Sequence, residues 1–140
     1  MKYRSVFDII GPIMIGPSSS HTAGAARIGK VARSLFRRQP EWVDIHLYGS
    51  FAKTYKGHGT DVAIIGGIMD FETDDERIIR SIEIAEAAGM VIRFFEEVAV
   101  PDHPNTVKIR MGDENSDMEM VGISIGGGKI EIIELNSFIL

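Results

Sequence analysis

Four hydroxyl groups and one imidazole stand on consecutive residues near the N-terminus: Ser18, Ser19, Ser20, His21 and Thr22. The apolar spacing that follows predicts a helix over Ala23–Arg38, so this cluster stands where the helix begins. The first N–H groups of a helix lack intrahelical partners, and the helix dipole is positive there. We therefore expect a small anion such as a carboxylate at this cluster. A serine acting only as N-cap is the structural alternative, although one residue suffices for that.

Two further loops carry a histidine in a setting that suits ligand binding. Glycines flank His58, so the backbone there can approach a ligand closely. Prolines stiffen the loop over residues 101–105, which holds His103 and Asn105. Histidine exchanges protons near neutral pH and can donate a hydrogen bond to a carboxylate. We predict that these two loops and the serine cluster line one surface cleft for a small polar ligand.

Three other chemistries fit these residue types less well. The three loop histidines could hold a catalytic zinc ion, but no HExxH or other tight ligand spacing is present. Serine hydrolase chemistry lacks a GxSxG elbow, and a serine next to its histidine is poorly placed for attack. Pyridoxal phosphate chemistry would need Lys56 as the Schiff-base lysine, with no separate phosphate cradle beside it.

The serine cluster resembles a family signature. Residues 16–22, Gly-Pro-Ser-Ser-Ser-His-Thr, are similar to the signature of the β chain of iron–sulfur-dependent L-serine dehydratase. Four further segments match that family in order: Tyr48-Gly49-Ser50, residues 56–61 (Lys-Gly-His-Gly-Thr-Asp), His103-Pro104-Asn105, and residues 124–128 (Ser-Ile-Gly-Gly-Gly). The similarity runs over nearly the whole chain.

The resemblance implies a lyase that deaminates L-serine to pyruvate and ammonia without pyridoxal phosphate, in amino-acid degradation and gluconeogenesis. In that family a [4Fe–4S] cluster with one open iron binds the substrate hydroxyl as a Lewis acid. A base removes the α-proton, and the enamine product then hydrolyses. The cluster's cysteines belong to a partner α subunit, in agreement with the absence of cysteine from this sequence. The resemblance therefore implies a heterodimer in which this subunit is inactive alone.

Site residues are carried over from the matching motifs. The resemblance implies catalytic roles for His58 and His21, with His58 near the substrate hydroxyl or the proton transfer. It implies substrate binding, to the carboxylate and amino groups, by the remaining motif residues: Ser18, Ser19, Ser20, Thr22, His103 and Asn105. No metal ligand is expected within this chain, and the identity of the α-proton base stays open.

A reading from a different class stays open as well. The chain also resembles the extra regulatory domain of some phosphoglycerate dehydrogenases, which would make it a non-catalytic module that binds a small anion. The loops discriminate between the two readings, because a plain anion site needs a helix N-terminus and cations rather than three loop histidines.

Composition limits the remaining possibilities. The chain has 140 residues and a formal net charge of −5, so we expect one domain and neither a nucleic-acid nor a membrane surface. There is no apolar run long enough to span a membrane and no signal peptide, which predicts a cytoplasmic protein. A homodimer is a candidate assembly. Many family members continue into a regulatory ACT domain, and we expect residues 1–140 to be a β-chain domain without one.

Periodicity predicts the fold class. A short helix over Ser5–Ile10 is expected first, and apolar positions predict two more helices, one with Val62, Ile65 and Met69 on one face and one over residues 73–89. Alternation predicts one strand over 43–47 and then four more: Met90–Glu97, Thr106–Gly112, Met118–Ile125 and Lys129–Leu135. We predict an α+β two-layer sandwich with helices on one face of a mixed or antiparallel sheet.

Overall fold

The computed structural model describes residues 20–54, 59–99 and 101–140. The predicted helix over Ser5–Ile10 lies outside this part of the chain, as do Ser18, Ser19 and His58. In chain order the elements are α1 (Ser20–Phe36), β1 (Trp42–Leu47), α2 (Gly49–Thr54), α3 (Thr60–Ile68), a 3₁₀ helix η1 (Glu76–Arg80), α4 (Ser81–Ala87), β2 (Val91–Glu96), β3 (Thr106–Gly112), β4 (Asp117–Gly126), β5 (Lys129–Leu135) and β6 (Phe138–Ile139).

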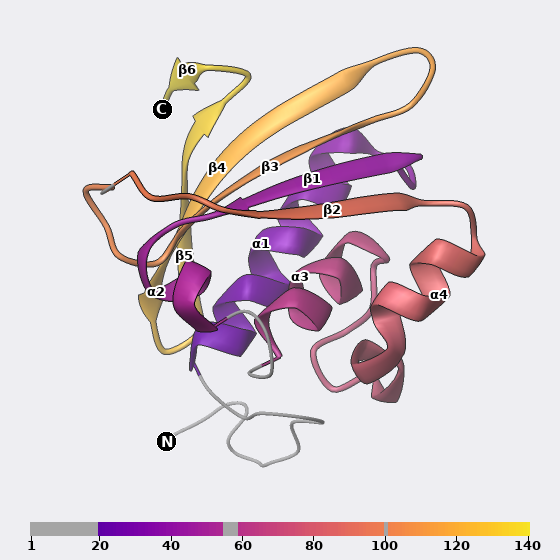
Figure 1. Cartoon of the computed structure of the whole chain (residues 1–140), viewed down its shortest axis with the longest axis horizontal. Coiled ribbons are helices and arrows are strands. Elements are labelled where there is room, and N and C mark those ends of the chain that lie inside the picture. Colours follow the sequence, from indigo (N-terminus) through magenta and orange to yellow (C-terminus); the bar gives the residue numbers. More distant parts are fainter. Residues whose placement is uncertain (1–19, 55–58, 100) are drawn as a thin grey trace.

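The strands form one mixed sheet in the order β2-β1-β3-β4-β5-β6. Strand β1 pairs parallel with β2 and antiparallel with β3, and the remaining pairs are antiparallel. The helices lie along one face of this sheet (Figure 1). The predicted α+β class with a mixed sheet is therefore confirmed. The short predicted connections correctly indicated antiparallel pairing from β3 to β5, whereas the position of β1 between β2 and β3 is not visible in local sequence.

The two faces of the sheet differ as the alternation in β1 predicts. Its inward side chains are all fully buried: Val43, Ile45 and Leu47. On the other face the Arg93 guanidinium donates two hydrogen bonds of 2.8 Å to the Asp44 carboxylate. His46 lies 2.7 Å from a Glu97 carboxylate oxygen, measured from Nδ1. His46 thus has a local structural partner, in keeping with the absence of a predicted role.

Helices α1 and α3 touch through glycines. A Cβ added to Gly67 would overlap the Ala26 carbonyl oxygen and the backbone of Gly29. Seven of the nine residues of α3 are buried: Thr60, Ala63, Ile64, Ile65, Gly66, Gly67 and Ile68. The prediction of a single apolar face on this helix was too narrow, because α3 lies between α1 and the η1–α4 segment.

We expect Gly67→Ala to destabilise the fold by about 3 kcal/mol, since a methyl group would force two backbones apart. That corresponds to a fall in Tm of about 10 °C for a chain of this size. Gly66→Ala on the same helix is the matched control, because its Cβ would meet only the Ile78 side chain, at 3.1 Å. Thermal melting of both variants by circular dichroism measures the difference. Equal melting temperatures would contradict this account of the helix contact.

Helix α1 begins three residues earlier than predicted and ends two residues earlier. Ser20, His21 and Thr22 therefore lie in its first turn rather than before it. The chain leaves the helix at Arg37, which has a positive φ of 76°. Leu35 is 43% exposed despite its apolar side chain, because the residues of α1 that face the core form a narrow stripe. In the described residues no helix combines the length and hydropathy needed to cross a membrane.

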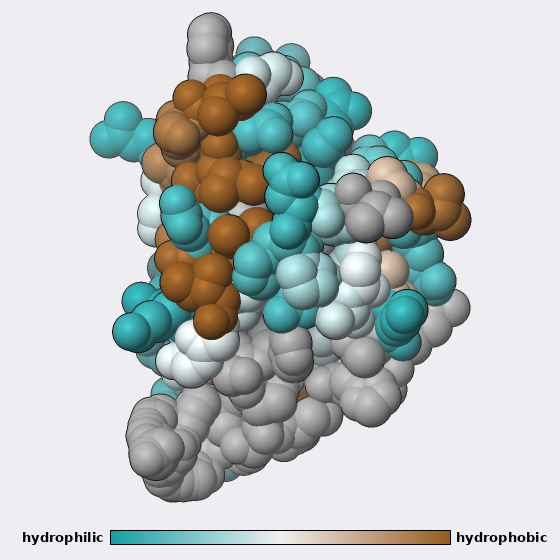
Figure 2. All heavy atoms as spheres, turned by 90° about the vertical axis from the view of Figure 1, so that its left-hand side faces the viewer, coloured by the Kyte–Doolittle hydropathy of each residue, from teal (hydrophilic) through white to brown (hydrophobic). Residues whose placement is uncertain are grey.

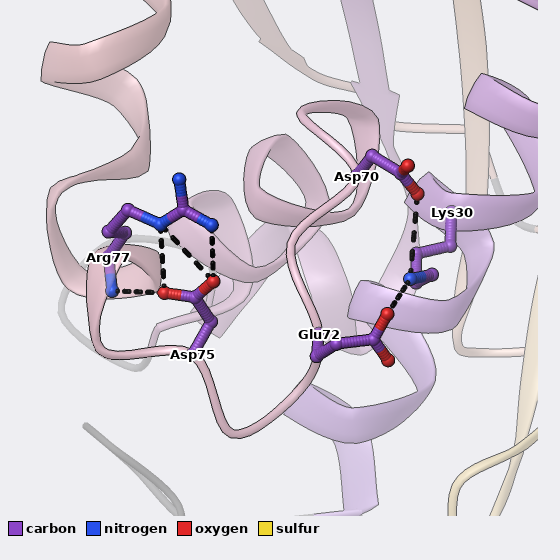
Figure 3. A network of polar contacts seen from close by, with 5 residues as sticks. All are labelled: Lys30, Asp70, Glu72, Asp75 and Arg77. Carbon is purple, nitrogen blue, oxygen red and sulfur yellow. Dashed lines mark hydrogen bonds and ion pairs between the residues drawn. The ribbon is translucent and has the colours of Figure 1, made fainter.

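The predicted helix over residues 73–89 is divided in two. A 3₁₀ helix has three residues per turn, so the face that buries Ile78 turns Ile79 outward, where it is 51% exposed. Asp75 caps η1 by accepting a 2.9 Å hydrogen bond from the Arg77 N–H. Its carboxylate also pairs with the Arg77 guanidinium at 2.6 Å (Figure 3). The predicted glycine at the end of this segment is confirmed, since Gly89 has a φ of 96°.

A second ion-pair group in Figure 3 ties the segment after α3 to α1. Lys30 of α1 lies 2.8 Å from a Glu72 carboxylate oxygen and 3.5 Å from an Asp70 carboxylate oxygen. These carboxylates raise the pKa of Lys30 above its ordinary value, with the hydrogen bond to Glu72 the largest cause.

The capping pair predicts a pH dependence of stability. Hydrogen bonds from Arg77 lower the pKa of Asp75 to about 2. A carboxyl group with a lowered pKa stabilises the fold above its unfolded-state pKa, and the contribution is lost as the pH falls toward 2. Asp75→Asn keeps a capping oxygen but removes the charge. We expect a fall in Tm of about 1–3 °C at pH 7 that becomes much smaller as the pH falls to about 2. A difference that persists at pH 2 would contradict the charge assignment.

Candidate functional site

The loop His103-Pro104-Asn105 is held by three separate parts of the chain. All three of its carbonyl oxygens accept a hydrogen bond: His103 O from Thr106 Oγ1 at 2.6 Å, Pro104 O from the Ser50 N–H at 2.7 Å, and Asn105 O from the Ser124 N–H at 3.0 Å. The donors belong to β3, α2 and β4. A backbone fixed at every carbonyl presents its side chains in defined directions, which is what a binding site requires.

The segment Tyr48-Gly49-Ser50 has a structural explanation in this loop. Gly49 adopts a positive φ of 58°, and a Cβ there would overlap the backbone of Pro104. Tyr48 and Ser50 donate their N–H groups to Thr106 O and Pro104 O. Only glycine allows this close approach, so the segment supports the His103 loop through its backbone.

The protonation of His103 follows from its local geometry. The Asn105 N–H donates a 3.1 Å hydrogen bond to His103 Nδ1. A nitrogen that accepts a hydrogen bond carries no proton, so the neutral ring has its proton on Nε2. His103 thus offers Nε2–H as a donor, which suits a carboxylate oxygen.

The end of β4 joins this loop to helix α1. Ser124 is 1% exposed, and a Cβ on Gly24 of α1 would overlap its hydroxyl. The glycine turn that follows has positive φ angles of 98°, 63° and 79° at Gly126, Gly127 and Gly128. A Cβ on Gly128 would lie 3.7 Å from the Ala23 side chain. The three glycines form this turn, and their lack of side chains also lets the turn lie beside the start of α1.

Two buried polar atoms at this junction have no hydrogen-bond partner among the described residues: Asn105 Oδ1 and Ser124 Oγ. Asn105 was among the predicted substrate-binding residues. Ser124 was not, although it opens the fifth family-like segment. The signal that finds Ser124 is its burial next to a helix glycine, which cannot be read from sequence alone.

The structure describes only some of the remaining predicted site residues. Thr22 is 5% exposed in the first turn of α1, where Ser20 and His21 also lie. Because Gly24 touches Ser124 and Ser124 bonds Asn105, the start of α1 and the His103 loop belong to one region. Ser18, Ser19 and His58 lie outside the described residues. A single cleft shared by all these side chains therefore stays a prediction.

Helix α3 begins differently from its prediction. Gly59, with a φ of 85°, is its N-cap, and no side chain makes the capping bond expected of Thr60 or Asp61. Thr60 is 1% exposed, and the Asp61 carboxylate accepts a 2.8 Å bond from the Val62 N–H. Burial raises the pKa of Asp61. This carboxyl group, three residues after His58 in sequence, therefore holds a proton more readily than an exposed aspartate.

A groove of about 530 Å³ is lined in part by residues of the connection that carries the His103 loop. Its walls come from α2, the end of β2 and the connection to β3: Gly49, Ala52, Lys53, Glu96, Glu97, Val98, Ala99, Pro101 and Pro104.

Comparison with known proteins decides the family. The sequence model of the serine dehydratase beta chain family matches residues 5–90. The chain belongs to this family. The resemblance drawn from the five short segments is therefore confirmed.

Two bacterial β chains of serine dehydratase align with almost all of this sequence. The probable L-serine dehydratase beta chain of Bacillus subtilis is 72% identical over 138 residues, 99% of this chain and 63% of its own length. The L-serine dehydratase beta chain of Peptoniphilus asaccharolyticus is 48% identical over 139 residues, 97% of this chain and 62% of its own length. This chain thus spans less than two thirds of either relative.

A third relative is a longer polypeptide. The L-serine dehydratase of Haemophilus influenzae is 32% identical over 152 residues, which cover 90% of this chain but only 33% of the relative. In that protein the region like this chain is one third of a larger whole.

Proposed function

We propose that this chain acts in the β subunit of L-serine dehydratase, an ammonia-lyase that converts L-serine to pyruvate and ammonia. The observation that carries the proposal is the junction of the α1 N-terminus with the His103-Pro104-Asn105 loop, in a chain of the serine dehydratase beta chain family. Residues 1–140 would form one domain of that subunit, and they would act in amino-acid degradation and gluconeogenesis in the cytoplasm.

The substrate carboxylate would bind at the start of α1. The first N–H groups of that helix offer donors and a positive dipole end, and Ser18, Ser19, Ser20 and Thr22 would add hydroxyl donors. His103 supports this orientation, because its Nε2–H is available as a donor in the neutral ring. Each of these groups recognises a planar anion better than a neutral ligand.

We assign proton transfer to His58 and His21, the two histidines whose motifs imply a catalytic role in this family. His58 would act near the substrate hydroxyl or the α-proton, and His21 would assist from the first turn of α1. Histidine suits this role because its ordinary pKa lies close to neutral pH.

The residues of this chain do not fit a cluster-holding site. The sequence has no cysteine, and within the described residues no group of three His, Asp or Glu side chains converges as a metal site. Iron–sulfur clusters are held mainly by cysteine thiolates. We therefore assign the [4Fe–4S] cluster to a partner α subunit, where it would supply Lewis-acid chemistry at the substrate hydroxyl.

A larger assembly agrees with the lengths of the relatives. The matching region is one third of the Haemophilus influenzae enzyme, so a complete dehydratase of this family can contain much more polypeptide than this chain. Figure 2 shows hydrophobic residues gathered in a band on the face that looks left in Figure 1. Three large apolar side chains near the last strands are exposed: Ile125, Ile139 and Leu140. Such a band would suit either the α subunit or a homodimer contact.

A second candidate function is favoured by the helix N-terminus alone. A regulatory module that binds a small anion would use the same start of α1 and would perform no reaction. The fixed His103 loop and the family membership favour the lyase.

The test is an assay of the complete enzyme containing this β chain, purified without air, for pyruvate and ammonia released from L-serine. Equal amounts of both products support the lyase. Tight L-serine binding without either product would support the regulatory module instead.

A further inference from the structure

The two unpartnered polar atoms at the β3–β4 end lie on one face of the sheet. The β3–β4 register pairs Thr106 with Ile123, and one step further Asn105 stands opposite Ser124, joined by the Ser124 N–H to Asn105 O bond. Opposite residues in an antiparallel pair point to the same face. That face is the one covered by α1, since Ser124 touches Gly24 and Gly122 touches Ile28.

Leaving both atoms unpaired is unfavourable for folding. A buried polar atom without a partner costs about 1–3 kcal/mol, and most such atoms in native proteins are satisfied. Both atoms here have almost no contact with solvent. Ser81 shows the ordinary arrangement, because its buried hydroxyl donates a 2.7 Å bond to Val62 O. The exception at Ser124 and Asn105 therefore points to a ligand group that completes the pairing.

The chemistry of the two atoms selects the ligand group. An amide oxygen only accepts hydrogen bonds, and a serine hydroxyl can accept as well as donate. The backbone at the start of α1, by contrast, offers only N–H donors to a ligand. An L-serine molecule carries a carboxylate that needs donors and an ammonium group that needs acceptors. The two halves of the site therefore suit the two ends of an amino acid.

We propose that Ser124 Oγ, together with Asn105 Oδ1, binds the α-ammonium group of the amino-acid substrate. The assignment rests on the proposed dehydratase function and adds Ser124 to the substrate-binding residues. Ser124 selects for the amino group of the ligand, while the start of α1 holds its carboxylate.

The experiment compares two ligands in the complete enzyme. L-serine carries the ammonium group, and 3-hydroxypropanoate has the same carboxylate and hydroxyl without it. We expect Ser124→Ala to lower kcat/KM for L-serine by about 10- to 100-fold, since a hydrogen bond to a charged group is lost. The inhibition constant of 3-hydroxypropanoate should stay within about twofold of wild type, a margin well below any lost hydrogen bond. Asn105→Ala provides a second, independent loss of an ammonium acceptor.

Ser81→Ala is the matched control, since it removes a buried serine hydroxyl that is already paired. It should lower Tm and leave both ligands unaffected, because its bond to Val62 O joins α4 to α3 and neither residue is among the proposed ligand-binding residues. Ser124→Ala should keep or raise Tm, because it removes an unpaired polar atom. If Ser124 had only a structural role, Ser124→Ala would lower Tm and leave both ligands unaffected, as expected for Ser81→Ala.

Two results would overturn the assignment. One is a Ser124→Ala enzyme that converts L-serine as well as wild type. The other is an equal loss of affinity for L-serine and for 3-hydroxypropanoate. A wild-type complete enzyme that forms no pyruvate from L-serine would instead remove the dehydratase function on which the assignment rests.

Discussion

We expect replacement of His58 by alanine in the complete enzyme to lower turnover of L-serine by about 100- to 10,000-fold, which is the usual contribution of a general acid or base. The melting temperature of the enzyme stays close to that of wild type. The sequence places His58 between two glycines, a pattern typical of loops, so we expect it to contribute little to a packed core. This one variant therefore distinguishes a catalytic role of His58 from a structural role.

Steady-state kinetics and thermal melting of the same preparation provide the two measurements. His46→Ala is the control, because it removes a histidine from the open face of the sheet, where the ring pairs with Glu97 and stacks on Phe95. That variant should lose some stability and keep full turnover. Turnover near the wild-type value in His58→Ala would remove His58 from the mechanism.

We expect the isolated chain to form no pyruvate from L-serine, and we expect activity only when a cysteine-bearing α subunit is added. Departure of the β-hydroxyl requires stabilisation of the leaving oxygen, for which a Lewis-acidic metal is effective. With no cysteine, this chain cannot supply the ligands of a [4Fe–4S] cluster. We therefore expect no pyruvate formation by the chain alone and full pyruvate formation by the complete enzyme.

Anaerobic reconstitution with iron and sulfide checks this prediction directly. The isolated chain should acquire no [4Fe–4S] absorption, whereas a mixture with the α subunit should acquire both the absorption and pyruvate formation. Circular dichroism of the isolated chain is the control for folding. Pyruvate formation by the chain alone, unaffected by iron chelation and by air, would contradict the proposed division between subunits.

Local sequence patterns predict most elements of this fold because they report burial along one segment. The alternation in Val43, Ile45 and Leu47 indicates a half-buried strand, and their complete burial confirms it. The same reasoning fails where the helix type changes. Ile79 matches an α-helical stripe, but η1 has three residues per turn and directs this side chain to solvent.

In the candidate site, too, local sequence predicts some residues, while others depend on contacts between distant segments. The motifs of the sequence are enough to predict His103 and Asn105 as site residues. The three bonds that hold their backbone come from Thr106, Ser50 and Ser124, two of which are distant in sequence. No periodicity connects such segments, so the importance of Ser124 emerges only when β4 and α1 are seen together.

The position of β1 between β2 and β3 also sets the order in which the protein can fold during synthesis. Both partners of β1 are made after it, and the pairing of Trp42 with Gly112 joins residues 70 positions apart (112 − 42). At a synthesis rate of about 5–20 residues per second, the ribosome needs roughly 4–14 s to reach the second partner. During that time the edge of β1 that pairs with β3 is unpaired, which makes the nascent chain prone to strand aggregation and to binding by chaperones.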